Sequence, residues 1–354
     1  MLPVLMGIGG LRLTPGEEDL IRRCQPAGFV LFSRNIANAR QTRELTDSLR
    51  ALCRHVPVIA VDQEGGRVVR TTALGLELPA ASQIRRSGNI PALVKMAENI
   101  AISLRLLGFN MDLAPVLDIC HDETVRNALP SRCWGTTPDE VVSMGGMFNR
   151  NLRHYGITTC AKHFPGMGLA QSDPHADLPT IDASREELLQ SSLIPFMALE
   201  PELPAIMSAH ILVPHLDANL PATLSHTIMT GLLRFQLGYK GVIMTDDLCM
   251  GAITNNYGVP QAADMALEAG CDLVLICHHA EEHLNEWHPL PSPQNGTDRD
   301  ESLLRLERFS RDLVPPLRWD DRLWEQCLHS AQNLVEEMQP FSSPASPSSP
   351  VQHM

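Results

Sequence analysis

Residues 241–247 read Gly241-Val242-Ile243-Met244-Thr245-Asp246-Asp247, in which the apolar, β-branched run Gly241–Asp246 is followed by a second acidic residue. The run does not alternate between polar and apolar positions, which is typical of a parallel strand buried on both faces. Seven further short apolar runs occur in the chain, at Leu2–Gly7, Gly28–Ser33, Pro57–Asp62, Phe109–Val116, Thr158–His163, Ala205–Ile211 and Asp272–His278. The sequence therefore predicts eight buried strands.

Amphipathic stretches separate most of these predicted strands. Thr137, Pro138 and the acids that follow them give one stretch a cap, a proline in the first turn and early negative charge, which are signals of a helix start. The clearest predicted helices are Gln41–Leu52, Ile90–Leu107, Pro138–Tyr155, Arg185–Leu199 and Pro260–Ala269. Because eight strands that alternate with helices fit a closed barrel better than an open sheet, we predict a single (β/α)8 TIM-type barrel of the α/β class.

The chain changes character after the last predicted strand. We expect a polar loop over His278–Asp300 and C-terminal helices over Glu301–Leu313 and Asp320–Met338. The last residues, Gln339–Met354, are mostly Ser and Pro and are expected to be disordered. The chain is thus divided into one barrel domain, residues 1–338, and a disordered tail, residues 339–354.

The composition argues against several classes of protein. A formal net charge of −13 over 354 residues is unlike a nucleic-acid-binding protein, which needs a basic surface, and gives no reason to expect binding to anionic lipid. No apolar run is long enough to span a bilayer, and the N-terminal residues lack the features of a secretory signal. The nine cysteines are odd in number and scattered, so we expect free thiols. These features predict a cytoplasmic protein without nucleic-acid or membrane partners.

Ionisable residues collect at the ends of four predicted strands. Asp62 ends the third strand, Lys162 and His163 end the fifth, His210 lies near the end of the sixth, and Asp246 ends the seventh. One such residue alone is usually a helix cap or a turn residue. Four strand ends meet at one edge of a barrel, where the active sites of such enzymes lie, so a shared pocket is the better interpretation. Carboxylates, cations and histidines without a phosphate-binding glycine motif suit a hydroxyl-rich substrate such as a sugar.

The loop after the fifth strand is the most informative stretch. It reads Lys162-His163-Phe164-Pro165-Gly166-Met167-Gly168-Leu169-Ala170-Gln171-Ser172-Asp173-Pro174-His175. A carboxylate such as Asp173 beside an imidazole such as His175 can fix the tautomer of the ring and raise its basicity, which suits acid–base chemistry near neutral pH. The pair alone is equally compatible with metal ligation or with a hydrogen bond that stabilises the loop.

This loop resembles the signature K-H-[FI]-P-G-[HL]-G-x4-D-[ST]-H of the β-N-acetylglucosaminidase branch of glycoside hydrolase family 3. Two positions depart from it, because Met167 stands where the family usually has His or Leu, and Pro174 where it has Ser or Thr. Five other stretches are similar to family landmarks and follow in the same order, namely Val61–Arg70, Asn110–Val116, Arg132–Gly135, Met207–His210 and Gly241–Met250.

The resemblance implies a glycoside hydrolase, namely a retaining exo-β-N-acetylglucosaminidase of peptidoglycan recycling. The implied substrates are small muropeptides, GlcNAc-1,6-anhydroMurNAc and its peptides, from which terminal GlcNAc is removed through a covalent glycosyl-enzyme. Asp246 would be the nucleophile and His175 the acid/base with Asp173 as its partner, whereas Asp247 would be structural. The resemblance implies no metal and no other cofactor. The residues expected to bind the sugar are Asp62, Arg70, Arg132, Lys162, His163 and His210.

Three alternatives remain open at the level of sequence. The first is another family 3 activity, either a β-glucosidase or a GlcNAc phosphorylase, because a histidine acid/base does not repel an anionic phosphate acceptor. The second is a metal-dependent barrel hydrolase that uses His278, His279, His283 and His288, although no H-E-x-x-H pattern supports it. The third is a non-catalytic sugar-binding barrel.

Overall fold

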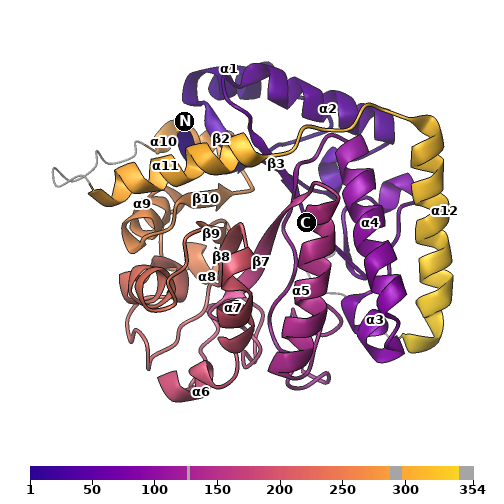
Figure 1. Ribbon diagram of the computed structural model, residues 1–354. Helices are drawn as coiled ribbons and strands as arrows, with labels where there is room; N and C mark the ends of the chain where they lie inside the picture. The colour runs from indigo at the N-terminus through magenta and orange to yellow at the C-terminus, as the bar shows by residue number, and fades with distance from the viewer. Residues whose placement is uncertain (126–127, 288–296, 343–354) are drawn as a thin grey trace.

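The computed structural model describes residues 1–125, 128–287 and 297–342 and shows a closed barrel surrounded by helices (Figure 1). Eight parallel strands pair in the order β1-β10-β9-β8-β7-β6-β3-β2. The strands are β1 (Leu2–Gly7), β2 (Pro26–Leu31), β3 (Val58–Val61), β6 (Met111–Asp112), β7 (Thr158–Phe164), β8 (Ala205–Ser208), β9 (Val242–Asp247) and β10 (Leu273–Ile276). The predicted (β/α)8 barrel is confirmed.

The strands overlap the predicted runs, but four of the eight, β3, β6, β8 and β10, are shorter. The fourth barrel strand, β6, has two residues where eight were predicted. Pro115 has no N–H to donate to a ladder, and the chain after it pairs irregularly, with Leu117 N donating to Lys162 O at 2.6 Å. A two-stranded hairpin that was not predicted, β4 (Gln63–Gly65) with β5 (Val68–Val69), follows β3 at the carboxyl end of the barrel.

The helices that cover the barrel begin at the expected caps. Thr137 caps α5 (Pro138–His154) by accepting a hydrogen bond from the backbone N–H of Glu140, with Pro138 in the first turn. The other helices outside the barrel are α1 (Pro15–Cys24), α2 (Ala39–Leu52), α3 (Ala81–Ser87), α4 (Ile90–Leu106), α6 (Arg185–Leu189), α7 (Ile194–Leu199), the π-helix η5 (Thr227–Gln236), α8 (Gly251–Thr254), α9 (Val259–Ala269) and α10 (Ala280–Glu286).

Two helices predicted at the C-terminus close the molecule. In Figure 1, α11 (Thr297–Asp312, orange) crosses one mouth of the barrel, and α12 (Asp321–Met338, yellow) runs beside α4. Leu306 and Leu313 join the apolar interior of the barrel, where side chains such as Leu5 and Met244 are inaccessible to solvent. The buried carboxylate of Asp272, just before β10, bonds to Arg305 at 2.8 Å and so fixes α11 to the amino-terminal mouth.

Two further predictions from the sequence differ from the structure. The helix predicted over Arg185–Leu199 is two helices, α6 and α7, because Pro195 in the first turn of α7 cannot donate to the preceding turn. The loop predicted over His278–Asp300 is wrong in part, since it contains α10 and the first turn of α11, and residues 288–296 lie outside the described residues.

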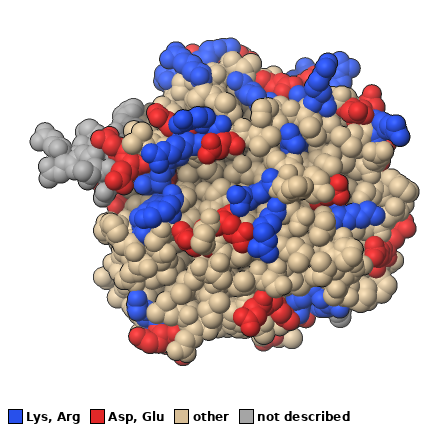
Figure 2. All heavy atoms as spheres, in the orientation of Figure 1, with Lys and Arg blue, Asp and Glu red and all other residues tan. Residues whose placement is uncertain are grey.

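The predicted tail begins in an ordered turn. Gln339–Phe341 forms a 3-10 turn against α3, where Arg86 donates to Phe341 O at 3.2 Å. Residues 343–354 of the predicted tail lie outside the described residues. None of the helices that the structure describes is long and apolar enough to cross a bilayer. On the face shown in Figure 2, acidic and basic side chains are interspersed and do not form a patch of one sign.

Candidate active site

The carboxyl ends of the strands bring the predicted residues to one cavity. Asp62 follows β3, Lys162 and His163 end β7, and Asp246 lies at the end of β9. These side chains line a cavity of about 60 Å³ together with Arg70, Arg132, Glu64, Met167, Pro174 and His175. Seven of the nine residues singled out in the sequence therefore line one cavity, and the other two, Asp173 and His210, lie behind it.

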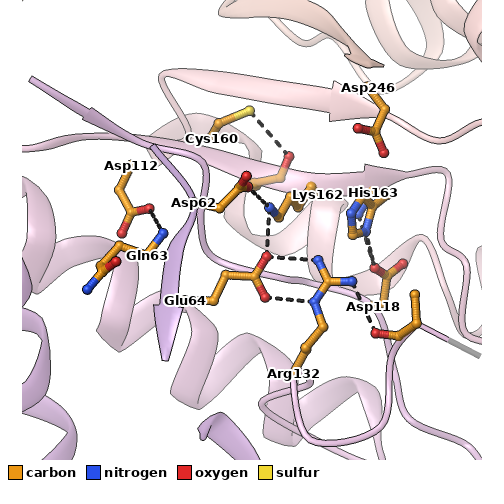
Figure 3. A network of polar contacts seen from close by, with 12 residues as sticks. Asp62, Gln63, Glu64, Asp112, Asp118, Arg132, Cys160, Lys162, His163 and Asp246 are labelled. Atoms are coloured by element: carbon orange, nitrogen blue, oxygen red, sulfur yellow. Dashed lines mark hydrogen bonds and ion pairs between the residues drawn. The ribbon is translucent and has the colours of Figure 1, made fainter. Parts of the chain in front are cut away.

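Two carboxylates, the partly buried Asp62 and the buried Glu64, hold two buried cations on one side of this cavity (Figure 3). The Lys162 ammonium lies 2.7 Å from Asp62 and 2.7 Å from Glu64. The Arg132 guanidinium donates two hydrogen bonds to Glu64, at 2.7 and 2.8 Å. Sequence reasoning missed Glu64, which is 5% exposed. It lies within the stretch Val61–Arg70 that resembles the family, and the β4–β5 hairpin turns it inward.

All four groups of this network are held in their charged forms. Burial alone would raise the pKa of Glu64, but Arg132 and Lys162 lower it well below its usual range. Burial opposes ionisation of Asp62 in the same way, and Lys162 with Arg70 lowers its pKa. Burial would lower the pKa of Lys162, but Asp62 and Glu64 raise it above its ordinary value. The site therefore presents fixed charges to a polar ligand before the ligand binds.

Asp246 lies half-buried at the end of β9. Its Oδ1 accepts a hydrogen bond of 2.8 Å from the backbone N–H of Asp247. Burial alone would raise the pKa of Asp246, but the nearby His163, His210 and His175 lower it below its ordinary value. The carboxylate is thus ionised and has an oxygen available to the cavity.

Asp173 and His175 form a close pair in the loop after β7. Nδ1 of His175 lies 2.5 Å from Oδ1 of Asp173, and the backbone N–H of His175 donates to the same oxygen at 3.0 Å. Burial alone would raise the pKa of Asp173, but its hydrogen bond to His175 and the charge of that ring lower it. Asp173 therefore orients the ring, and His175 rather than Asp173 lines the cavity.

The loop that carries this pair is held against the segment that follows Asp246. Gly251 N donates to His175 O at 3.2 Å, and Ala252 N donates to Pro174 O at 3.1 Å. Asn255 Nδ2 adds a hydrogen bond of 3.0 Å to Ala176 O. The turn into α8 thereby connects the loop of His175 to the strand that ends in Asp246.

His210 does not occupy the position expected of a sugar-binding residue. Its ring is inaccessible to solvent, Nδ1 lies 2.8 Å from Thr223 Oγ1, and Nε2 lies 2.9 Å from the backbone oxygen of Asp247. Both ring nitrogens are therefore taken by protein partners. The prediction of direct sugar contact is not supported by this arrangement, which instead places His210 beneath Asp246 and Asp247 as a support.

Three of the four histidines that the metal-dependent alternative would use lie in described residues. His278 and His279 begin the turn into α10, His283 lies within that helix, and His288 lies outside the described residues. Within the part of the chain that the structure describes, no group of three or more His, Cys, Asp or Glu side chains could hold a metal ion.

A larger hollow of about 650 Å³ lies at the opposite mouth of the barrel, between η5, α9 and α11. Its buried charges neutralise each other, because Asp272 is paired with both Arg234 and Arg305 at 2.8 Å. The smaller cavity at the carboxyl end, in contrast, has an ionised carboxylate and an imidazole that face it. We therefore place the chemistry in the smaller cavity.

Comparisons with known proteins agree with this geometry. The family model described as "Glycosyl hydrolase family 3 N terminal domain" matches residues 7–289. A β-hexosaminidase of Alkalilimnicola ehrlichii is 36% identical over 336 residues, which cover 92% of this chain and 94% of the relative. A β-hexosaminidase of Pseudomonas aeruginosa is 34% identical over 279 residues, 78% of this chain and 82% of the relative.

Two solved structures are similar along nearly the whole chain. NagZ from Neisseria gonorrhoeae in complex with N-trifluoroacetyl-D-glucosamine has a TM-score of 0.80 and 29% identity, and the match covers 94% of this chain and 98% of that one. A fungal multi-domain GH3 β-N-acetylglucosaminidase has a TM-score of 0.84 and 34% identity, and the match covers 95% of this chain but only 42% of the fungal one.

Proposed function

Because the chain belongs to glycoside hydrolase family 3 and is an enzyme of the β-hexosaminidase type, we propose that it is a retaining exo-β-N-acetylglucosaminidase. The single observation that carries this proposal is the convergence on one cavity of Asp246 and of His175, whose ring Asp173 orients. An ionised carboxylate and an oriented imidazole supply the two groups that a double-displacement reaction requires.

The two steps follow from this arrangement. Asp246 attacks the anomeric carbon while His175 protonates the departing glycosidic oxygen, which forms a glycosyl ester and breaks the glycosidic bond. Water then attacks the same carbon, His175 accepts its proton, and the Asp246 carboxylate is released. In most retaining glycosidases a second carboxyl group serves as acid and base. An imidazole does the same work near neutral pH without a raised pKa.

The charged side of the cavity suits the hydroxyl groups of a terminal sugar. Asp62 can accept hydrogen bonds from sugar hydroxyls, and Lys162, Arg132 and Arg70 can donate to sugar oxygens. His163 lines the same cavity next to Asp246. N-trifluoroacetyl-D-glucosamine bound to the similar Neisseria enzyme supports a sugar with an acylated 2-amino group as the ligand.

The proposed natural substrates are muropeptides that carry terminal GlcNAc, namely GlcNAc-1,6-anhydroMurNAc and its peptides. This choice rests on the family likeness, in which the matching Neisseria enzyme has almost the same length as this chain. We place the protein in the cytoplasm because all nine cysteines are free thiols, as in a reducing compartment.

Turnover of aryl β-N-acetylglucosaminide, compared with aryl β-glucoside, tests the proposed function. Each substrate is assayed in buffer with and without inorganic phosphate. We expect hydrolysis of the N-acetylglucosaminide alone, at a rate that phosphate does not change. Preference for the glucoside would indicate a β-glucosidase, a sugar 1-phosphate product would indicate a phosphorylase, and no turnover of either would indicate a binding protein.

Trapping of the covalent intermediate tests the retaining mechanism separately. A mechanism-based fluorosugar should label the peptide that contains Asp246, as located by mass spectrometry. Asp246→Ala should fold, since Asp246 is half-buried, and it should be neither labelled nor active. Labelling of another residue would overturn the assignment of Asp246.

A further inference from the structure

Another buried carboxylate, Asp118, does not line the cavity itself but contacts two residues that do, His163 and Met167. Asp118 is 1% exposed and accepts three hydrogen bonds. Its Oδ2 lies 2.6 Å from Nδ1 of His163 and accepts the backbone N–H of His163 at 3.2 Å. Its Oδ1 accepts the backbone N–H of Met167 at 2.6 Å. Both oxygens are therefore committed to the segment that ends β7 and begins the loop of His175.

These contacts indicate which atom of the pair donates. Each oxygen of Asp118 accepts a backbone N–H, so the side chain acts as the hydrogen-bond acceptor in this cluster. The ring nitrogen 2.6 Å away must then be the donor, which fixes the proton on Nδ1 of His163. The other ring nitrogen, Nε2, is left for the cavity. Figure 3 shows His163 between Asp118 and Asp246.

We infer that Asp118 is a positioning residue that holds His163 with Nδ1–H on its own carboxylate and Nε2 toward Asp246 and the terminal sugar. This inference rests on the proposed function and deepens it, because it names the residue that orients a group of the sugar-binding wall. Asp118 also fixes the first turn of the loop that carries His175, through Met167 N.

Asparagine is a stringent replacement because it has the same shape but only one acceptor oxygen. In one orientation of the amide, its NH2 faces the N–H of Met167, and in the other it faces both N–H groups of His163. Either orientation opposes a donor to a donor, which loses the hydrogen bond to the loop at Met167 in the first case and the hydrogen bonds to His163 in the second. Since a misplacement of about 1 Å can cost about 10²-fold in rate, Asp118→Asn should lower kcat/KM by about 10²-fold.

A double-mutant cycle separates positioning from a structural role. We would measure kcat/KM on aryl β-N-acetylglucosaminide for Asp118→Asn, His163→Gln and the double variant. If Asp118 acts through His163, the double variant should be within a few-fold of the weaker single variant. If the two losses multiplied, or if Asp118→Asn matched the parent enzyme, the inference would be overturned.

Asp272→Asn is the matched control, because Asp272 is an equally buried carboxylate at the opposite mouth of the barrel, where it pairs with Arg234 and Arg305. It should lower thermal stability while kcat/KM stays unchanged at a temperature where the variant is folded. A loss of kcat/KM in this control equal to that of Asp118→Asn would mean that any buried charge loss disturbs the site, which would also overturn the inference.

Proton NMR of the unsubstituted enzyme tests the inference even if Asp118→Asn fails to fold. An imidazole N–H donated to a buried carboxylate gives a low-field resonance that exchanges slowly with solvent. With ¹⁵N-labelled histidine, such a resonance should be lost in His163→Gln, and the corresponding signal of His175 should be lost in His175→Ala. Absence of the His163 resonance from the unsubstituted enzyme would overturn the inference. Failure of this enzyme to hydrolyse the N-acetylglucosaminide would instead overturn the proposed function, and the resonance would still report on the Asp118 contact.

Discussion

The guanidinium of Arg132 and the carboxylate of Glu64 face each other through two parallel hydrogen bonds of 2.7 and 2.8 Å, although 68 residues separate them in the chain. Both side chains are 5% exposed. A planar fork that meets a planar carboxylate in this way fixes direction as well as distance. Glu64 thus orients Arg132 and, through a further 2.7 Å contact, Lys162. The sugar-binding wall is preorganised by a residue that is not itself predicted to bind sugar.

Glu64→Ala should destabilise the protein by roughly 3–5 kcal/mol and raise KM, because it leaves Arg132 without its carboxylate and Lys162 with only Asp62. Urea unfolding and initial-rate kinetics measure the two effects. Glu123→Ala is a matched control, since Glu123 also joins two arginines, Arg85 and Arg86, but at the surface with 40% of its side chain exposed. The control should lose about 1 kcal/mol or less. Equal losses in the two variants would contradict the role given to burial.

Asp112→Asn should stabilise the protein increasingly as pH rises from about 4 to 8. Asp112 is completely buried on β6, and burial raises its pKa from 3.8 to about 8. Below about pH 4 the carboxyl is protonated in both the folded and the unfolded chain. Between 4 and 8 only the unfolded chain ionises, so the parent protein loses stability over this window. Asparagine keeps the oxygen that accepts the 2.9 Å hydrogen bond from Gln63 N and has no charge to bury.

The difference in free energy of unfolding between Asp112→Asn and the parent protein is the quantity to measure, because it cancels the titration of other groups. It should grow by roughly 1 kcal/mol per pH unit within the window, and level off above it. A difference that is constant from pH 4 to 8 would show that Asp112 ionises normally in the folded protein.

Gly251→Ala should displace the loop that carries His175. A Cβ at this position would lie 2.5 Å from Ala176 O and 2.8 Å from His175 O, and these are backbone atoms that cannot rotate away. The variant should lose about 10- to 100-fold in kcat/KM, with little change in stability. Gly258→Ala is the matched control, because Gly258 also lies at the start of a helix, as the N-cap of α9, and a Cβ there would meet nothing within 4 Å. If both variants kept full activity, the contact between the loop and α8 would have no part in placing His175.

The same loop bears on how substrate enters. A cavity of about 60 Å³ is much smaller than the roughly 300–1,000 Å³ of sites that bind small molecules. Met167, Pro174 and His175 form part of its wall, so a shift of this loop is the direct way to admit a sugar. Both departures from the family signature lie in this wall. Met167 is buried with its N–H on Asp118, and the oxygen of Pro174 accepts the hydrogen bond from Ala252.

The sequence predicts the barrel well because buried parallel strands leave a direct mark on composition. Runs such as Val242–Asp247 are apolar without alternation, and their ends place Asp62, Lys162 and Asp246 at one edge. The hairpin β4–β5 leaves no such mark, because its strands are too short for a period to show, and the apolar run Phe109–Val116 does not reveal that its strand β6 has only two residues. Helix α10 was not predicted either, because it has only seven residues and just two of them are buried.

Roles that depend on distant partners could not be predicted from sequence. Glu64 and Asp118 are acids among 41 acidic residues, and only the fold brings one to Arg132 and the other to His163. His210 shows the converse case, because its place at a strand end indicates a pocket residue, whereas Thr223 and the backbone of Asp247 occupy both its nitrogens. Strand ends indicate where a site lies but not which of its side chains face the ligand.

His175→Ala should lose activity in proportion to how poor the leaving group is. General acid–base assistance is typically worth about 10²–10⁴-fold, and a leaving group that departs unaided does not need the acid. The variant should therefore lose far more activity on a disaccharide or muropeptide than on an activated aryl substrate. With the activated substrate the glycosyl-enzyme should form and then accumulate, because its hydrolysis still requires a base, and azide should partly relieve this block.

Asp173→Ala should show a weaker form of the same pattern, since it removes only the carboxylate 2.5 Å from Nδ1 and leaves the imidazole in place. Equal losses on good and poor leaving groups in both variants would make the pair a brace for the loop, and the acid/base would then be sought at His163, the other histidine that lines the cavity.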